Sequence, residues 1–184
     1  SKLATNVMQS INNASQNGLE VFFIHGNRDF LCDQEFAKKS NLKILPDPFF
    51  MNFFDLKIAL SHGDDFCTND LKYIEFKKEV RSKQWKDKFL EKSLDERLKI
   101  ASNMRDVSES SSNDKDINIM DVTSKAIDQF FEEHHTDLLI HGHTHRPKIH
   151  QSDTGTRVVL GDWHKTGWCF FLDDQQQDLR EFKL

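Results

Sequence analysis

The stretch Asp137-Leu138-Leu139-Ile140-His141-Gly142-His143-Thr144-His145-Arg146-Pro147 places three histidines directly after a short apolar run. Two earlier apolar runs also end in polar side chains: residues 19–24 lead into His25-Gly26-Asn27-Arg28-Asp29, and residues 56–60 lead into Ser61-His62-Gly63-Asp64. The run 19–24 shows little alternation, which is typical of a strand buried on both faces of a helix-covered sheet. Because ligands usually bind beyond the carboxyl ends of such strands, the sequence predicts a mixed α/β fold with a functional site at three strand ends.

The rest of the chain predicts helices and strands around these runs. Apolar residues recur at helical spacing from Leu3, and an opening helix is predicted to end at Asn17-Gly18. Residues 49–54 and 56–60 predict paired strands joined at Asp55. A polar, serine-rich stretch predicts a loop over 108–116. Helices are also predicted over 33–40 and 119–135, and short strands over 137–140, 148–149, 156–160, 167–172 and 179–182.

Length and composition suit one globular domain, with 184 residues, 37% of them hydrophobic, and a net charge of −5. Three cysteines without a Cys-x-x-Cys pair argue against a disulfide scaffold or zinc ribbon, and suit a reducing cytosol. The negative charge argues against a general nucleic-acid binder. Residues 71–105 carry 11 Lys/Arg against 6 Asp/Glu, a local balance of +5. We therefore predict a single domain over 1–184 with a basic helical insertion over 70–118.

The residues at the three strand ends are candidate metal ligands. The Asn27 side chain offers a neutral oxygen, and the imidazoles of His62, His143 and His145 are common ligands of transition metals. In an extended segment, His143 and His145 would point to the same side. Each motif also has a simpler interpretation: a strand-to-helix turn at 25–29, a capping or core histidine at 62, and a histidine-rich surface loop at 141–147.

The series Gly26-Asn27-Arg28-Asp29, Ser61-His62-Gly63-Asp64 and Gly142-His143-Thr144-His145 resembles the later motifs of calcineurin-like metallophosphoesterases. This resemblance implies a four-layered α/β/β/α sandwich with a site for two divalent ions, usually Mn²⁺. It assigns Asn27, His62 and His143 to one ion and His145 to the other. The family's opening Asp-x-His and Gly-Asp motifs do not precede Asn27 in this sequence. We therefore expect an N-terminally incomplete chain that binds at most one ion tightly and hydrolyses its substrate poorly or not at all.

Further motifs resemble the branch of this family that acts in lipid A synthesis, namely Cys67-Thr68-Asn69-Asp70, Ile119-Met120-Asp121-Val122 and Val158-Val159-Leu160-Gly161-Asp162-Trp163-His164. The resemblance implies hydrolysis, by metal-activated water, of the pyrophosphate bond of a UDP-sugar that carries two acyl chains. We interpret Asp162-Trp163-His164 as structural or as part of the rim, not as metal ligands. The substrate contacts that the resemblance assigns are Asn27, Arg28, Asp70, Arg105, Ser108, Ser112, Lys115 and His143, where Ser112 replaces the commoner Asn.

The basic insertion fits a lid over such a substrate. An apolar face containing Phe89, Leu90, Leu94 and Leu98 would hold acyl chains, while the lysines would face an anionic membrane. We expect a cytoplasmic protein, peripheral on the inner face of the bacterial inner membrane, without nucleic-acid or protein partners. Three alternatives stay open: a phosphodiesterase acting on cyclic nucleotides or nucleic acid, a non-catalytic remnant that binds lipid or nucleotide, and a lid that is only a solvated helix pair.

Overall fold

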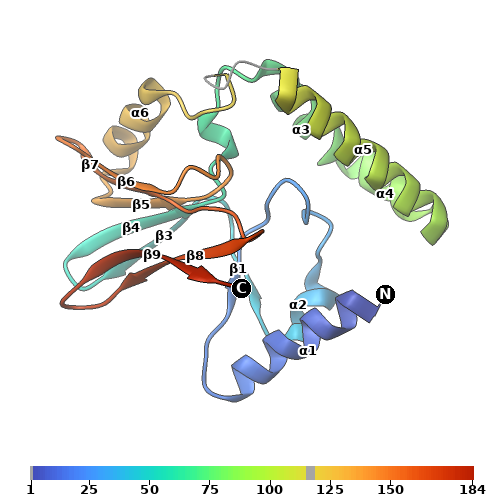
Figure 1. Ribbon diagram of the computed structural model, residues 1–184, viewed down its shortest axis with the longest axis horizontal. Coiled ribbons are helices and arrows are strands. Elements are labelled where there is room, and N and C mark those ends of the chain that lie inside the picture. Colours follow the sequence, from blue (N-terminus) through green and yellow to red (C-terminus); the bar gives the residue numbers. More distant parts are fainter. Residues whose placement is uncertain (1, 115–118) are drawn as a thin grey trace. The chain divides into compact units, whose positions relative to one another are not determined.

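The computed structural model describes residues 2–114 and 119–184, with side chains for all of these except 107–114. The chain divides into two compact units, one formed by residues 1–62 and 131–184 and the other by residues 63–130 (Figure 1). The chain contains both helices and a central sheet with parallel strands, so the mixed α/β class is confirmed. The predicted insertion 70–118 falls inside the second unit, while the assignment of a single domain stays a prediction.

The first unit contains the strands. Its helices are α1 (Lys2–Gln16), α2 (Gln34–Ser40) and the end of α6 (Ser124–His134). Its strands are β1 (Phe22–Phe23), β2 (Lys43–Ile44), β3 (Phe49–Phe53), β4 (Leu56–Ser61), β5 (Leu138–His141), β6 (Lys148–Ser152), β7 (Gly155–Val159), β8 (Thr166–Leu172) and β9 (Gln177–Lys183). They form a parallel pair β1-β2, a central sheet of order β3-β4-β5-β7-β6 and an antiparallel pair β8-β9.

The central sheet aligns the ends of three parallel strands. β5 pairs in parallel with β4 on one side and with β7 on the other, so that Ser61 lies opposite His141 and His141 opposite Val159. β3 and β6 are antiparallel neighbours at the two borders of the sheet. The loops that follow β4, β5 and β7 therefore leave the sheet at the same edge, as the sequence predicted for the first two.

Apolar packing on one sheet face holds these strands in register. Ile58, Leu138 and Val158 are each at most 2% exposed and pack with partly buried residues of β8 and β9, among them Phe170 and Leu179. Burying a side chain of this size contributes about 1.5–3 kcal/mol. These contacts fix the height of β4, β5 and β7 relative to one another.

The end of α6 packs on the sheet through a glycine. A Cβ on Gly155 would lie 2.6 Å from the Phe131 ring, so the close approach requires glycine there. Lys57 links the same region to β4: its Nζ donates to the His134 carbonyl at 2.6 Å, and its N–H donates to Asp137 at 2.7 Å. The segment that enters β5 is thereby fixed against the start of β4.

Helix α2 begins and ends where the sequence indicates. The Asp33 carboxylate accepts the N–H groups of Glu35 and Phe36, and Asn41 ends the helix in the left-handed conformation. The Asn41 side chain also donates to the Ser15 hydroxyl at 2.7 Å, which joins α2 to α1. The predicted opening helix is confirmed by α1.

The predicted bounds of three elements are wrong. The run 19–24 forms only the two-residue strand β1, and Phe22 is 48% exposed, because β2 is its only strand neighbour among the described residues. The predicted loop 108–116 is helical as far as Asp114, since α5 continues through the serine-rich stretch. The predicted helix 119–135 begins five residues later, at Ser124.

The second unit is helical, as predicted for residues 70–104. It contains the short 3-10 helix Asp64–Phe66, then α3 (Leu71–Val80), α4 (Lys83–Leu90), α5 (Leu94–Asp114) and most of α6. The side chains of Asp70 and Ser82 accept N–H groups at the starts of α3 and α4. Of the helices that the structure describes, none is long and apolar enough to cross a membrane.

A buried carboxylate in the second unit joins the short 3-10 helix to α3. Asp64 is 1% exposed, and its Oδ2 accepts the Tyr73 hydroxyl at 2.7 Å and lies 3.0 Å from Lys77 Nζ. Arg81 approaches the same oxygen at 3.6 Å. Burial, together with the adjacent Asp64 carboxylate, raises the pKa of Tyr73, so its hydroxyl stays protonated and donates. One aspartate thus engages three side chains on successive turns of α3.

We predict that Asp64→Ala lowers the free energy of unfolding by about 3 kcal/mol, because it removes the buried acceptor that Tyr73, Lys77 and Arg81 share. Asp65→Ala is the matched control: Asp65 is exposed and, among the described residues, pairs with Lys77 at 2.7 Å, so its loss should cost less than about 1 kcal/mol. Urea unfolding of the two variants gives both values. Equal losses would show that the Asp64 network is not the anchor.

Candidate metal centre

The loop after β1 is closed by its own side chains. The His25 ring nitrogen Nε2 bonds the Cys32 carbonyl at 2.6 Å, and the Gly26 N–H donates to the Asp29 carboxylate. A carbonyl oxygen can only accept, so His25 carries its proton on Nε2. Asn27 and Arg28 therefore lie within a fixed loop, with Asn27 partly buried and Arg28 exposed.

His62 meets both of the other motifs. Its carbonyl accepts the Gly142 N–H at 3.1 Å, and its ring lies 4.9 Å from the His143 ring, centroid to centroid. On another side, a Cβ on Gly26 would lie 3.1 Å from both Cδ2 and Nε2 of His62. The structure thus brings together His62, His143 and Gly26, the glycine before Asn27, as predicted for these motifs, although Gly26 and His143 are 117 positions apart.

The histidine loop has an unusual backbone. His143 and His145 have φ values of +64° and +53°, in a region of backbone conformation that residues other than glycine seldom adopt. The Gly142 carbonyl accepts the Thr144 N–H at 2.8 Å, which closes a three-residue turn around His143. The expectation of an extended segment is therefore wrong, because the turn sets the direction of each imidazole. Residues in such conformations are frequent at ligand sites.

His141 has a structural role. It is 1% exposed, its Nδ1 bonds the Gly142 carbonyl at 3.0 Å, and its Nε2 lies 3.3 Å from Arg157 Nη1. A guanidinium can only donate, so Nε2 is the acceptor and Nδ1 carries the proton. The ring thereby braces the turn in front of His143 and has no nitrogen left for a metal ion.

The donor groups fit one divalent ion in part. Two neighbouring imidazoles, packed edge to face, suit a transition-metal ion, and the Asn27 amide next to Gly26 would add a neutral oxygen. Within 2–114 and 119–184, however, no three His, Cys, Asp or Glu side chains lie close enough together to hold an ion by themselves. The structure thus places the rings of His62 and His143 close together, while the metal-binding roles of these two residues, Asn27 and His145 stay predictions.

The segment after β7 lies at the same edge of the sheet. The Leu160 N–H donates to the His141 carbonyl at 2.7 Å, and Asp162, Trp163 and His164 follow it in exposed positions. The Trp163 indole donates to the Trp168 carbonyl at 2.7 Å. This placement agrees with the interpretation of these three residues as part of the rim.

The predicted substrate contacts of the second unit are only partly described. Asp70 is buried and caps α3, and Arg105 is exposed on α5. Ser108 and Ser112 belong to α5, but their side chains lie outside the described ones, and Lys115 lies outside the described residues altogether. Their roles toward a substrate therefore stay predictions.

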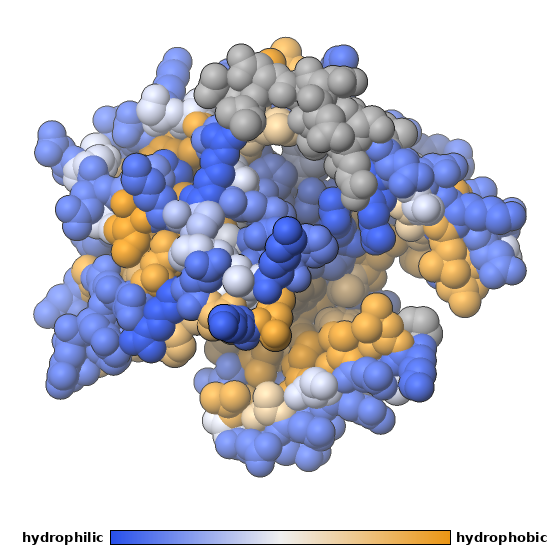
Figure 2. All heavy atoms as spheres, viewed as in Figure 1, coloured by the Kyte–Doolittle hydropathy of each residue, from blue (hydrophilic) through white to orange (hydrophobic). Residues whose placement is uncertain are grey.

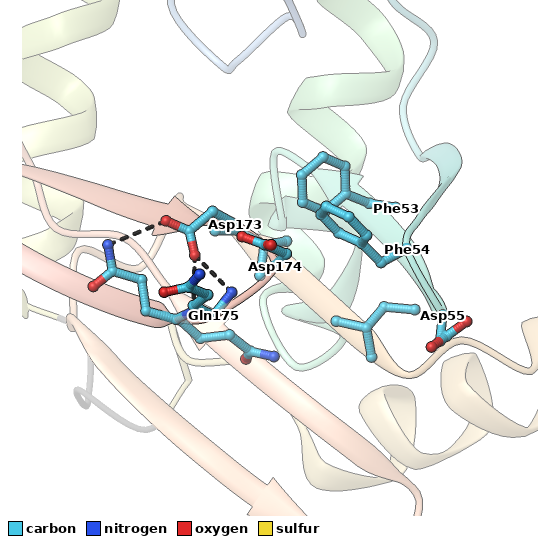
Figure 3. A pocket seen from close by; sticks show the side chains of 10 residues that line it. Phe53, Phe54, Asp55, Asp173, Asp174 and Gln175 are labelled. Atoms are coloured by element: carbon cyan, nitrogen blue, oxygen red, sulfur yellow. Dashed lines mark hydrogen bonds between the residues drawn. The ribbon is translucent and has the colours of Figure 1, made fainter.

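A shallow pocket of about 270 Å³ lies at the opposite end of the sheet, between the β3-β4 and β8-β9 turns (Figure 3). Its rim carries Asp55, Asp173 and Asp174 beside Phe53 and Phe54. The Asp173 carboxylate accepts the N–H groups of the two residues that follow Asp174, and these bonds lower the pKa of Asp173. The pocket is acidic and would repel a phosphate, so it is not the site for a nucleotide.

Comparison with known proteins decides the family. The family model described as calcineurin-like phosphoesterase matches residues 2–147. The chain belongs to this family. Divalent metal ions are therefore implied for the centre around His62 and His143.

Individual proteins that are similar to this chain include curated relatives and solved structures. The UDP-2,3-diacylglucosamine hydrolase of Histophilus somni (strain 2336) is 41% identical over 167 residues, which are 90% of this chain and 71% of that protein. The protein of the same name from Yersinia pseudotuberculosis serotype O:1b is 41% identical over 165 residues, 88% of this chain and 69% of that one. Among solved structures, an archaeal phosphodiesterase matches with a TM-score of 0.51 at 13% identity, covering 96% of this chain and 74% of that one. The last match supports the fold alone.

We predict that Gly26→Ala weakens binding of Mn²⁺ about tenfold, because the added methyl group would displace the His62 ring. Gly142→Ala is the matched control, since a Cβ there would meet only the His62 carbonyl, at an ordinary 3.8 Å. Calorimetric titration with Mn²⁺ compares the two affinities. Equal affinities would show that His62 does not depend on the space beside Gly26.

Proposed function

We propose that this chain hydrolyses the pyrophosphate bond of UDP-2,3-diacylglucosamine, releasing UMP and 2,3-diacylglucosamine 1-phosphate in lipid A synthesis. The observation that supports it most directly is the edge-to-face pair of the His62 and His143 rings, set beside Gly26, in a chain 41% identical to hydrolases of that name. Pyrophosphate hydrolysis needs a site where cationic charge meets phosphate oxygens, and a divalent ion held by these motifs would supply that charge.

Each residue of the centre has a role in this proposal. His62 and His143 would hold a divalent ion through ring nitrogens, with Asn27 as a neutral oxygen ligand and His145 beside them. We propose Mn²⁺ as the ion, which polarises a phosphoryl oxygen and lowers the pKa of bound water when it is present. Arg28 is exposed on the closed loop beside Asn27, and its guanidinium can bind phosphate oxygens in a bidentate manner.

The helices of the second unit supply surfaces suited to a lipid. Leu90, Leu94 and Leu98 are 53–59% exposed, and Figure 2 shows apolar side chains among hydrophilic ones over these helices. Phe89, which the sequence grouped with them, is instead buried and stacks on Trp85 with 4.8 Å between ring centroids. It therefore holds α4 together and does not belong to the apolar surface.

We propose that this apolar surface contacts the acyl chains and that the surrounding Lys and Arg side chains attach the protein to the anionic cytoplasmic face of the inner membrane. Each such cation near an anionic bilayer contributes on the order of 1 kcal/mol, and salt screens this attraction. Arg105, Ser108, Ser112 and Lys115 would contact the substrate from α5 and the segment after it, and Asp70 from the start of α3.

We predict slow release of UMP from UDP-2,3-diacylglucosamine that requires added Mn²⁺ and falls at least about 100-fold in His143→Ala, because the ion loses an imidazole. His164→Ala is the matched control, an exposed histidine at the same edge of the sheet, and should stay within about twofold. Calorimetric binding of the intact substrate to the Mn²⁺-loaded chain tests the assignment independently of turnover. A wild-type chain that neither binds nor cleaves this substrate would contradict the proposal.

We predict that Leu94→Ser combined with Leu98→Ser weakens binding of the diacylated substrate at least tenfold while Mn²⁺ affinity is unchanged, because both exposed side chains lose their apolar contacts. Leu3→Ser, at an exposed leucine of α1, is the control. Binding of the wild type to anionic vesicles should fall as salt rises. Salt-independent vesicle binding and unchanged substrate affinity in the double variant would show that these helices are only a solvated pair.

A further inference from the structure

A carboxylate that the sequence did not single out lies at the carboxyl end of β4. Asp47, in the segment between β2 and β3, accepts the Ser61 hydroxyl on Oδ1 at 2.7 Å and the His62 N–H on Oδ2 at 3.2 Å. One side chain thus binds the last residue of the strand and the histidine that follows it. Both contacts lie within the first unit of the chain.

Asp47 is one of several groups that contact both the backbone and the ring of His62. The N–H of His62 is held by Asp47, and its carbonyl by the Gly142 N–H at 3.1 Å. The ring is confined between the Gly26 backbone and the His143 ring. Of these contacts, the bond from Asp47 is the one made by a charged side chain.

We propose that Asp47 is a positioning residue of the metal centre. It sets the orientation of His62 through the last peptide of β4, and its negative charge lies behind a set of neutral imidazole and amide donors. Its two oxygens accept from Ser61 and His62, so the carboxylate acts on the end of β4 and through it on the His62 ring. Partners that orient ligands in this manner typically change metal affinity 10- to 100-fold when they are removed. The proposal rests on the metal site proposed above.

Three substitutions test separately how Mn²⁺ affinity depends on the orientation of His62, on the charge of Asp47 and on the contact with Ser61. Asp47→Ala removes both acceptors and the charge, and should weaken Mn²⁺ binding 10- to 100-fold. Asp47→Asn keeps one acceptor oxygen but loses the charge, so its affinity should lie between those of Asp47→Ala and the wild type. Ser61→Ala leaves the bond to the His62 N–H in place and should stay within about twofold.

Mn²⁺ affinity is measured by following the EPR signal of the free ion, and amide hydrogen exchange of His62 is measured by NMR in the metal-free protein. We expect faster exchange at His62 in Asp47→Ala and wild-type exchange in Ser61→Ala. Thermal unfolding without metal shows whether each variant is folded at the titration temperature. If Asp47→Ala does not fold, the expected order of affinities is tested with Asp47→Asn and Ser61→Ala.

The possible outcomes distinguish this proposal from the proposed function. Mn²⁺ affinity that is unchanged in folded Asp47→Ala and Asp47→Asn, with a wild type that binds, would overturn the role of Asp47 and leave the metal site intact. A wild type that binds no Mn²⁺ would overturn the metal site and this role together. Weakened affinity with unchanged His62 exchange would overturn positioning through the backbone.

Discussion

The parallel pairing of β5 with β4 is the constraint on which the candidate centre depends. It places Ser61 opposite His141, so the residues that follow each strand leave the sheet together. The bond from the Gly142 N–H to the His62 carbonyl extends this pairing past the strand ends. Without that register, the rings of two histidines 81 positions apart in the sequence would not be in contact.

The residues that pack the sheet lie along the strands, whereas the candidate functional residues lie at the carboxyl ends of the strands. Ile58, Leu138 and Val158 are buried on one sheet face and keep the strands in register, whereas the carboxyl ends carry hydrogen-bonding groups instead of apolar ones. There the backbone is fixed by local polar contacts, such as the turn around His143 and the bonds of His141. The centre is thus supported by both the apolar sheet and a polar outer set of contacts.

The sequence predicted the features that depend on local pattern. The apolar runs before His62 and His143 are strands, and the side chains that follow them meet, because hydrophobic runs and strand direction are both readable along the chain. Features set by partners distant in the sequence were not predicted. Asp47, for example, shows no local sign that it binds residues 14 and 15 positions later.

Three further differences between the sequence prediction and the structure concern the backbone. His143 and His145 have positive φ angles, which are typical of glycine. A histidine in the sequence therefore gives no sign of such a turn. The serine-rich stretch after Arg105 has weak helix propensity, yet α5 continues to Asp114. Burial patterns of strands also depend on which neighbours pair with them, which is why β1 is shorter and more exposed than its apolar sequence predicts.

The metal centre proposed for this chain requires that His62 and His143 together bind one divalent cation at the carboxyl ends of β4 and β5. Pulsed EPR of the Mn²⁺-loaded chain, with histidine nitrogens labelled as ¹⁵N, observes such ligands directly through their hyperfine couplings. We expect couplings from at least two imidazole nitrogens, one of which disappears in each of His62→Ala and His143→Ala. A spectrum with only oxygen ligands, or one unchanged by both substitutions, would contradict it.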